Sequence, residues 1–151
     1  WYHAAAAIGE PGAMFSLGSC YAGGHGVGQS WGEAVRWWCA AAEKGEPSAM
    51  FKLGECHAKG LGVGQDWGEA FRWYHAAAAI GEPGAMFSLG SCYAGGHGVG
   101  QSWGEAVRWW CAAAEKGEPS AMFKLGECHA KGLGVGQDWG EAFRWYHAAA
   151  A

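Results

Sequence analysis

The chain repeats itself with a fixed period, and this period constrains its fold more than any single motif does. Residues 37–72 recur unchanged as residues 109–144, and a close relative of the same length precedes each copy. Residues 1–79 are identical to residues 73–151, so the alternating pair has a period of 72 residues. Such self-similarity is typical of stacked-repeat architectures, in which each unit packs only on its neighbours. We therefore treat the chain as one array, with repeats at 1–36, 37–72, 73–108 and 109–144 and a partial repeat at 145–151.

Composition and charge argue against several functional classes. The net charge is −4 and charged residues make up 16% of the chain, without the clustered Lys and Arg that nucleic-acid binding requires. No apolar run approaches the ~20 residues of a membrane span, and no secretory signal pattern is visible. We expect neither a nucleic-acid partner nor a membrane span. The chain begins at Trp1, inside a repeat and without Met, so an upstream segment and the compartment remain open.

Each repeat is predicted to form two short helices, the first of which begins at a Glu-Pro pair such as Glu10-Pro11. Pro fits the first helical position because its missing N–H has no intrahelical partner there. Gly24 is expected to end this helix in the left-handed conformation. Residues at helical spacing form its apolar stripe: Met14, Leu17, Gly18 and Tyr21. Gly18 costs about 1 kcal/mol in helix propensity relative to alanine. We expect close packing of the partner helix against this glycine to offset that cost.

The second helix is predicted to open with a capping box, Ser30 and Glu33, and to end at Gly45. Its inward stripe is Ala34, Trp37, Trp38, Ala41 and Ala42. Helices this short are marginal alone, so packing must hold them. We expect that packing from one aromatic position stacked along the array: Trp1, Trp37, Trp73, Trp109 and Trp145.

The loop between the two helices carries the motif G-x-G-V-G-Q, as in residues 24–29. It resembles a phosphate-binding loop only superficially, because no strand precedes it and it lacks the Lys-Ser/Thr of a P-loop. Val27 and Val63 are expected to plug their loops into the core. Trp31 and its equivalents follow the cap, and the sequence leaves open whether they pack on the loop or form an exposed ridge.

The six cysteines occupy two repeat positions, which argues against a uniform disulfide framework. One position recurs in every repeat and the other in alternate repeats: Cys20, Cys56, Cys92 and Cys128, then Cys39 and Cys111. Four residues of one kind cannot pair uniformly with two of the other. We expect free thiols, with the first set behaving as small buried hydrophobes.

The pattern A-x-x-x-L-G-x-x-Y/H-x-x-G-x-G-V-x-Q-D/S-x-x-x-A-x-x-W-W/Y-x-x-A-A-x-x-G resembles the Sel-1-like repeat family, a relative of the tetratricopeptide repeats. The resemblance covers the whole chain. It implies an all-α fold, a right-handed α-solenoid of helix-turn-helix repeats with a 36-residue period and about four repeats. It also implies a protein–protein adaptor with no catalytic residues and no cofactor.

In this family the first helices line the inner surface. The resemblance therefore implies a partner-binding stripe of Phe15, Ser19, Phe51, Glu55, Lys59, Phe87, Ser91, Phe123, Glu127 and Lys131. Some members carry a disulfide within each repeat, but the matching positions here are Ala42 and Met14 or Met50. Gly32 also departs from the usual charged residue early in the second helix, which loosens its first turn.

The Cys and His residues could in principle form a catalytic pair or a metal site, or could serve only in packing. Cys56 and His57 are adjacent on a helix and therefore point about 100° apart, so a catalytic pair is not expected. A column of His and Cys runs along successive second helices: His3, Cys39, His75, Cys111 and His147. It offers only two zinc ligands within reach, so no metal site is assigned.

Three functions remain open. The first is a protein-binding scaffold that engages a protein or peptide partner through the stripe. The second is a self-assembling structural protein whose repeats, uncapped at both ends, stack end to end on further copies, because natural solenoids need polar terminal repeats. The third is a metal- or redox-responsive array. The sequence equally fits a piece of a longer array, a recent duplication or a designed chain.

Overall fold

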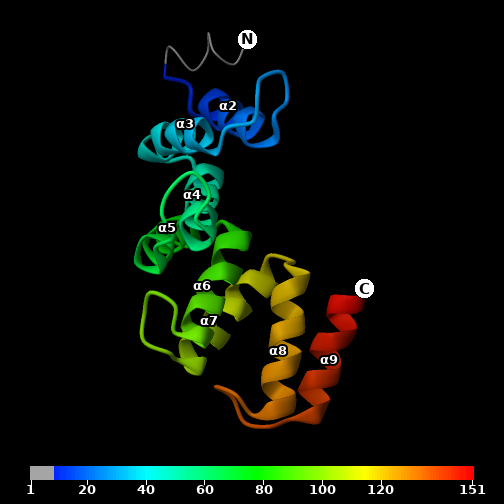
Figure 1. Cartoon of the computed structure of the whole chain (residues 1–151). Helices are drawn as coiled ribbons and strands as arrows, with labels where there is room; N and C mark the ends of the chain where they lie inside the picture. Colours follow the sequence, from blue (N-terminus) through cyan, green and yellow to red (C-terminus); the bar gives the residue numbers. More distant parts are fainter. Residues whose placement is uncertain (1–8) are drawn as a thin grey trace. The chain divides into compact units, whose positions relative to one another are not determined.

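The computed structural model describes residues 9–151, and they are helical throughout apart from short connections. Within these residues eight helices of 12 or 13 residues follow one another, and each helix that begins at a Glu-Pro pair forms a hairpin with the helix after it (Figure 1). The helices are α2 (Pro11–Gly23), α3 (Trp31–Glu43), α4 (Pro47–Lys59), α5 (Trp67–Ala79), α6 (Pro83–Gly95), α7 (Trp103–Glu115), α8 (Pro119–Lys131) and α9 (Trp139–Ala150). The prediction of an all-α fold built from two helices per 36 residues is confirmed.

The chain divides into two compact units, Trp1–Ile80 and Gly81–Ala151. In the first unit α2 packs on α3, α3 on α4 and α4 on α5, and the second unit repeats this order with α6 to α9. Each hairpin runs from one Glu-Pro pair to the next. The hairpins therefore begin ten residues after the repeat boundaries 1, 37, 73 and 109 that were assigned from the sequence.

The first helix of each hairpin begins and ends as predicted. Glu10 is the N-cap of α2, its carboxylate accepts from the Gly12 N–H, and Pro11 takes the first helical position. Gly24 is left-handed, with φ of 70°, and its N–H donates to the Cys20 carbonyl. The Glu-Pro pair and the cap glycine therefore fix both ends of this helix.

The glutamine of the G-x-G-V-G-Q motif closes the loop onto the helix before it. The side-chain amide of Gln29 donates to the Ala22 carbonyl at 2.8 Å. The same bond recurs at Gln65, Gln101 and Gln137. The motif is a helix-to-helix connection that satisfies carbonyls left without partners at a helix end. Val63 packs against the core as expected, but the prediction is wrong for Val27, which is 38% exposed.

Only half of the expected capping box forms at the second helix. The hydroxyl of Ser30 accepts from the Glu33 N–H at 3.2 Å. The reciprocal bond is absent because the Ser30 N–H donates to the Tyr21 carbonyl, while the Glu33 carboxylate pairs with Arg36. At the other end Gly45 has φ of 88°, and the Glu46 N–H donates to the Ala41 carbonyl, which is a Schellman termination.

The core of each hairpin is an aromatic ring seated on a glycine. A Cβ added to Gly18 would lie 2.4 Å from Nε1 of Trp38, so the indole occupies the place of a side chain. Trp38 is 2% exposed, and its Nε1–H donates to the Phe15 carbonyl at 3.1 Å. The other hairpins repeat the arrangement with Gly54 and Tyr74, Gly90 and Trp110, and Gly126 and Tyr146. The close approach predicted at Gly18 is therefore an approach of a ring.

Trp38 lies on the inward stripe as predicted, but the prediction that Trp37 and its equivalents are the rings that hold the array is wrong by one residue. Trp37 is only partly buried and packs against the edge of the core, whereas Trp38 lies inside it. Adjacent helical residues point about 100° apart, so Trp37 and Trp38 lie on different faces of the helix. Trp38 shares its face with Ala34, Ala41 and Ala42, each of which is at most 3% exposed. Trp1, the first member of the predicted column, lies outside the described residues.

Two glycine substitutions test this packing. Gly18→Ala places a methyl group inside the Trp38 ring, and we expect it to lower the free energy of unfolding by about 1–3 kcal/mol. Gly32→Ala is the matched control, because its Cβ would meet only Ser30 Oγ at 3.9 Å. We expect this second change to raise stability by up to about 1 kcal/mol. Urea unfolding followed by circular dichroism measures both, and a Gly18→Ala variant as stable as the parent chain would contradict the ring-on-glycine arrangement.

Candidate functional site

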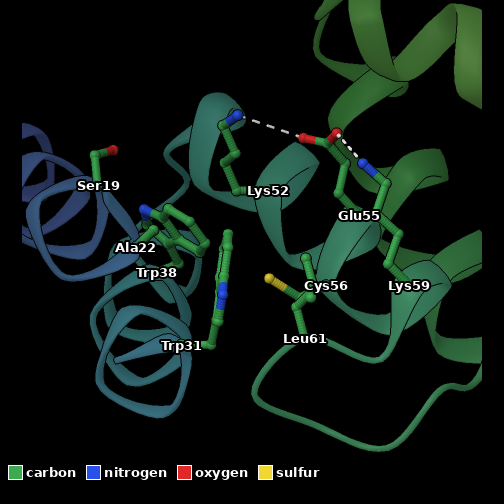
Figure 2. Close-up of a pocket in the computed structure, with 9 residues that line it drawn as sticks. All are labelled: Ser19, Ala22, Trp31, Trp38, Lys52, Glu55, Cys56, Lys59 and Leu61. Atoms are coloured by element: carbon green, nitrogen blue, oxygen red, sulfur yellow. Dashed lines mark ion pairs between the residues drawn. The ribbon is translucent and has the colours of Figure 1, made fainter. Parts of the chain in front are cut away.

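A cavity of about 270 Å³ lies between adjacent hairpins of the first unit (Figure 2). The hairpin α2/α3 supplies one wall and α4 with its following loop supplies the other. Its lining is Ser19, Ala22, Trp31, Trp38, Lys52, Glu55, Cys56, Lys59 and Leu61. The cavity thus joins residues from three consecutive helices, as expected where repeats stack through their flanks.

Two indole rings form the α3 side of this cavity. Trp38 is held by the glycine beneath it and by its bond to the Phe15 carbonyl. Trp31 is the first residue of α3, directly after the Ser30 cap, which fixes where its side chain leaves the helix. The ring centroids are 6.4 Å apart and the planes are inclined by 55°, within the range of favourable aromatic pairs. Of the two alternatives, Trp31 is packed rather than exposed, but against Trp38 rather than on the preceding loop, whereas its equivalent Trp139 is 66% exposed.

Charged side chains of α4 form the rim. Lys52, Glu55 and Lys59 follow one another at helical spacing, so they share one face. The Glu55 carboxylate lies 3.4 Å from the Lys52 ammonium and 3.7 Å from that of Lys59. The Lys59 side chain is 63% exposed and that of Glu55 is 27% exposed. These are loose surface pairs that carry little stability and leave the rim with one excess positive charge.

The thiol of Cys56 lines the cavity and is held in its protonated form. Its residue is 1% exposed, and burial, with a smaller contribution from Glu55, raises the pKa of the thiol to about 11. The buried Nδ1 of the neighbouring His57 ring has no hydrogen-bond partner, so this atom does not accept the thiol proton. At neutral pH the group is a neutral, weakly polar part of the lining.

The second unit contains the same cavity with the same residue types. Its volume is about 190 Å³ and its lining is Ser91, Ala94, Trp103, Trp110, Lys124, Glu127, Cys128, Lys131 and Leu133. The Trp110 Nε1–H donates to the Phe87 carbonyl at 3.2 Å, and Glu127 lies 3.5 Å from Lys124 and 3.6 Å from Lys131. The 72-residue period of the sequence therefore produces two equivalent sites.

The structure brings together part of the stripe expected from the family resemblance. Ser19, Glu55 and Lys59 meet in the first cavity, and Ser91, Glu127 and Lys131 in the second. The phenylalanines of the stripe instead lie against the ring of their own hairpin. Their centroid distances are 6.4 Å for Phe15–Trp38, 6.0 Å for Phe51–Tyr74, 6.5 Å for Phe87–Trp110 and 5.6 Å for Phe123–Tyr146.

Several lining residues were not singled out from the sequence. Lys52 precedes Glu55 by three positions, a spacing that pairs charges on a helix and was available as a signal. Ala22 and Leu61 give no signal of their own. They reach the cavity only because two hairpins pack side by side, which periodicity within one helix does not report.

The His and Cys column does not gather into a metal site. Within residues 9–151 no three His, Cys, Asp or Glu side chains lie close enough to hold an ion. The rings of His75 and His147 instead lie against Phe71 and Phe143, at 6.0 Å and 6.1 Å. His3 lies outside the described residues. All six cysteines are free thiols, and the predicted burial holds for Cys56, Cys92 and Cys128 but is partial for Cys20.

No helix in the part of the chain that the structure describes has the length and apolarity needed to span a bilayer.

Four helix-turn-helix units of about 36 residues define an all-α helical-repeat protein of the solenoid class. The sequence profile of the Sel1 repeat matches residues 11–46, 47–82, 83–118 and 119–151, the hairpins described above. The chain belongs to the Sel1 repeat family.

Similar proteins of known structure support this assignment. The Sel1 repeat protein from Oxalobacter formigenes is 36% identical, with a TM-score of 0.94 over 99% of this chain and 62% of its own. A protective antigen of uropathogenic Escherichia coli strains with an SLR fold, c5321, is 35% identical, with a TM-score of 0.97 over 99% of this chain and 32% of its own. A Pseudomonas aeruginosa protein, 19% identical with a TM-score of 0.57, shares the fold. This chain spans less than two thirds of the first two, and no curated protein matches it significantly.

The buried thiols give a chemical test of the packing. Cys56, Cys92 and Cys128 are at most 2% exposed, and burial raises the pKa of each from 9.0 to about 11. At pH 8 this lowers the thiolate fraction by about a hundredfold, so we expect alkylation by iodoacetamide to be slower by at least that factor than in urea. Cys20 and Cys92 lie in identical tryptic peptides, so half-buried Cys20 is the internal control in a Cys92→Ser variant, and Cys92 is followed in a Cys20→Ser variant, both by peptide mass spectrometry. Labelling of the three thiols at the unfolded rate would contradict the closed packing.

Proposed function

We propose that this chain is a non-catalytic scaffold that binds a protein or peptide partner through the two cavities and the first-helix residues beside them. The proposal is carried by one observation, the recurrence of a concave site with two indoles and a charged rim in both units. Sel1-like repeats typically mediate protein interactions. Concave apolar sites with a few charged groups are the usual form of a binding site.

The chemistry of the lining favours binding over catalysis. Enzymatic nucleophiles need an adjacent base and an orienting group. Cys56 has a raised pKa and no hydrogen-bonded imidazole, and the Glu55 carboxylate is already flanked by two ammonium groups. Aromatic rings surrounded by a polar rim are instead typical of contacts that anchor a partner.

A peptide-display selection tests the proposal. Random peptides are selected on the immobilised chain, and their binding is compared on a variant whose cavities are both filled by Ala22→Leu and Ala94→Leu. We expect enriched peptides to bind the filled variant at least about tenfold more weakly, the loss typical of one blocked anchor.

The matched control carries Ala40→Leu and Ala112→Leu, which enlarge the same residue type on the second helices. Ala40 lines a separate hollow of about 190 Å³ that has room for the larger side chain, so the fold should be kept. Failure to enrich any peptide, or equal loss in both variants, would reject the scaffold proposal.

A second candidate function is end-to-end association of copies, and a specific surface favours it. Phe123, Trp139 and Phe143 are 50%, 66% and 70% exposed, whereas the identical positions Phe51, Trp67 and Phe71 are partly buried. Phe123 also lines an open hollow of about 740 Å³, together with Phe87, Pro119, Ser120, Lys124, Tyr146, Ala149 and Ala150. Repeats bury such faces by stacking on a neighbouring repeat, so the occupant proposed is a hairpin of a second copy.

Light scattering over a concentration series tests this candidate. We expect the average mass of the 151-residue chain to rise with concentration, and Phe143→Asp to abolish the rise because it places a carboxylate in the apolar face. Arg144→Glu, on the neighbouring exposed position that pairs with Glu141, is the control and should leave the rise intact. A constant monomer mass would exclude association through this surface.

A further inference from the structure

We propose that each of the two cavities binds one aromatic side chain of a partner peptide, next to an Asp or Glu that meets the lysines of the rim. This inference rests on the proposed scaffold function and specifies the chemistry of the partner. Four properties of the cavities carry it: volume, inner lining, charge and duplication.

The volume selects a single ring. Dry apolar cavities of about 150 Å³ already accept benzene, and sites for drug-sized ligands and cofactors begin at about 300 Å³. The two cavities, at about 270 Å³ and 190 Å³, fall between these limits. Each therefore has room for a phenyl or indole group and is too small for a nucleotide or a comparable cofactor.

The inner lining selects an apolar guest. The Nε1–H of Trp38 and the hydroxyl proton of Ser19 both donate to the Phe15 carbonyl, so neither is available to a ligand. The Cys56 thiol beside them is a weak donor, and Ala22 and Leu61 complete the lining. What remains accessible is mainly the partly buried ring of Trp31, because Trp38 is only 2% exposed and forms a closed part of the wall (Figure 2). A guest ring gains there both from leaving water and from an inclined contact with the Trp31 indole.

The rim selects an acidic neighbour over a basic one. Two indoles and a carboxylate would also attract a cation, since aromatic faces bind ammonium groups. Here Glu55 already has the ammonium groups of Lys52 and Lys59 at 3.4 and 3.7 Å, so an entering cation meets one excess positive charge. A partner carboxylate finds the exposed Lys59 only loosely held. The chain's net charge of −4 matters less, because charges beyond about 8–10 Å are screened at physiological salt.

The duplication determines the stoichiometry. The second cavity has the same residue at every lining position, from Ser91 to Leu133. A peptide with one acidic-aromatic anchor should therefore occupy both sites independently. A partner that carries two anchors on a linker able to span the sites gains by effective concentration.

Three short peptides test the proposal by nuclear magnetic resonance on the ¹⁵N-labelled chain. The probes are acetylated, amidated Gly-Asp-Phe-Glu-Gly, Gly-Lys-Phe-Lys-Gly and Gly-Asp-Ala-Glu-Gly. We expect the first to shift the indole Nε1–H signals of Trp31 and Trp103 saturably, and the other two to bind at least about fivefold more weakly. Equal affinity for the lysine peptide, or for the alanine peptide, overturns the proposal.

Variants confined to one unit supply the internal control. Lys52→Glu with Lys59→Glu reverses the first rim and should remove the response of Trp31 while that of Trp103 remains. Ala22→Leu should do the same by filling the first cavity without a change of charge. Persistence of the Trp31 response in either variant overturns the proposal. An unchanged Nε1–H signal of Trp38, which donates to the Phe15 carbonyl, reports that the first unit of the variant is folded.

The outcomes separate this inference from the scaffold proposal. Display-selected peptides that bind the cavities but carry basic or aliphatic anchors would reject the acidic-aromatic partner and leave the scaffold standing. The absence of any selected peptide would reject both. Indole shifts that never saturate would show that the small hollows hold no ring.

Discussion

The structure depends on the contact between an aromatic ring and a glycine that has no side chain to keep it away. Gly18, Gly54, Gly90 and Gly126 each face a ring of the second helix, from Trp38, Tyr74, Trp110 or Tyr146. A glycine inside a helix costs about 1 kcal/mol relative to alanine. Truncation of a buried aromatic costs about 3–5 kcal/mol, so the ring outweighs the glycine that admits it. The short helices would not be stable alone, and the packing of the ring on the glycine holds them together as hairpins.

The same contact creates the candidate site. The Trp38 ring lies against Gly18 of α2, its N–H is bonded to the Phe15 carbonyl, and it lines the cavity that α4 closes from the other side. Trp31 adds a second ring from the start of α3, and the hairpin that follows contributes Lys52, Glu55 and Lys59. In the helices α2 and α6 the positions of these charges hold Ser and Gly. The alternation of two repeat types along the chain therefore combines indoles from one with charges from the other.

The sequence sufficed for the fold and for about half of the site. Helix ends were predictable because Glu-Pro, Ser or Asp caps and left-handed glycines act through local backbone chemistry. Both tryptophans were placed on the inward stripe, and the main packing role was assigned to Trp37 instead of Trp38, because adjacent tryptophans leave the phase of a stripe ambiguous within one helix. The second hydrogen bond of the capping box, from the Ser30 N–H to the Glu33 carboxylate, does not form. The N–H donates to the Tyr21 carbonyl instead, and the carboxylate pairs with Arg36. Ala22 and Leu61 line the cavity through packing between hairpins, for which a helical period carries no information.

The size of the cavities sets how such a scaffold can bind. Full burial of one aromatic side chain is worth about 1.5–3 kcal/mol, whereas association costs about 4–15 kcal/mol in lost freedom. One cavity of 190 to 270 Å³ therefore cannot capture a partner tightly on its own. Tight binding must draw on several anchors, and a chain of identical units supplies them without new sequence, since each further pair of repeats adds another equivalent site. Exact repetition then has a physical use: a partner with regularly spaced anchors meets the same preference at every site, and its affinity increases with the number of repeats it spans.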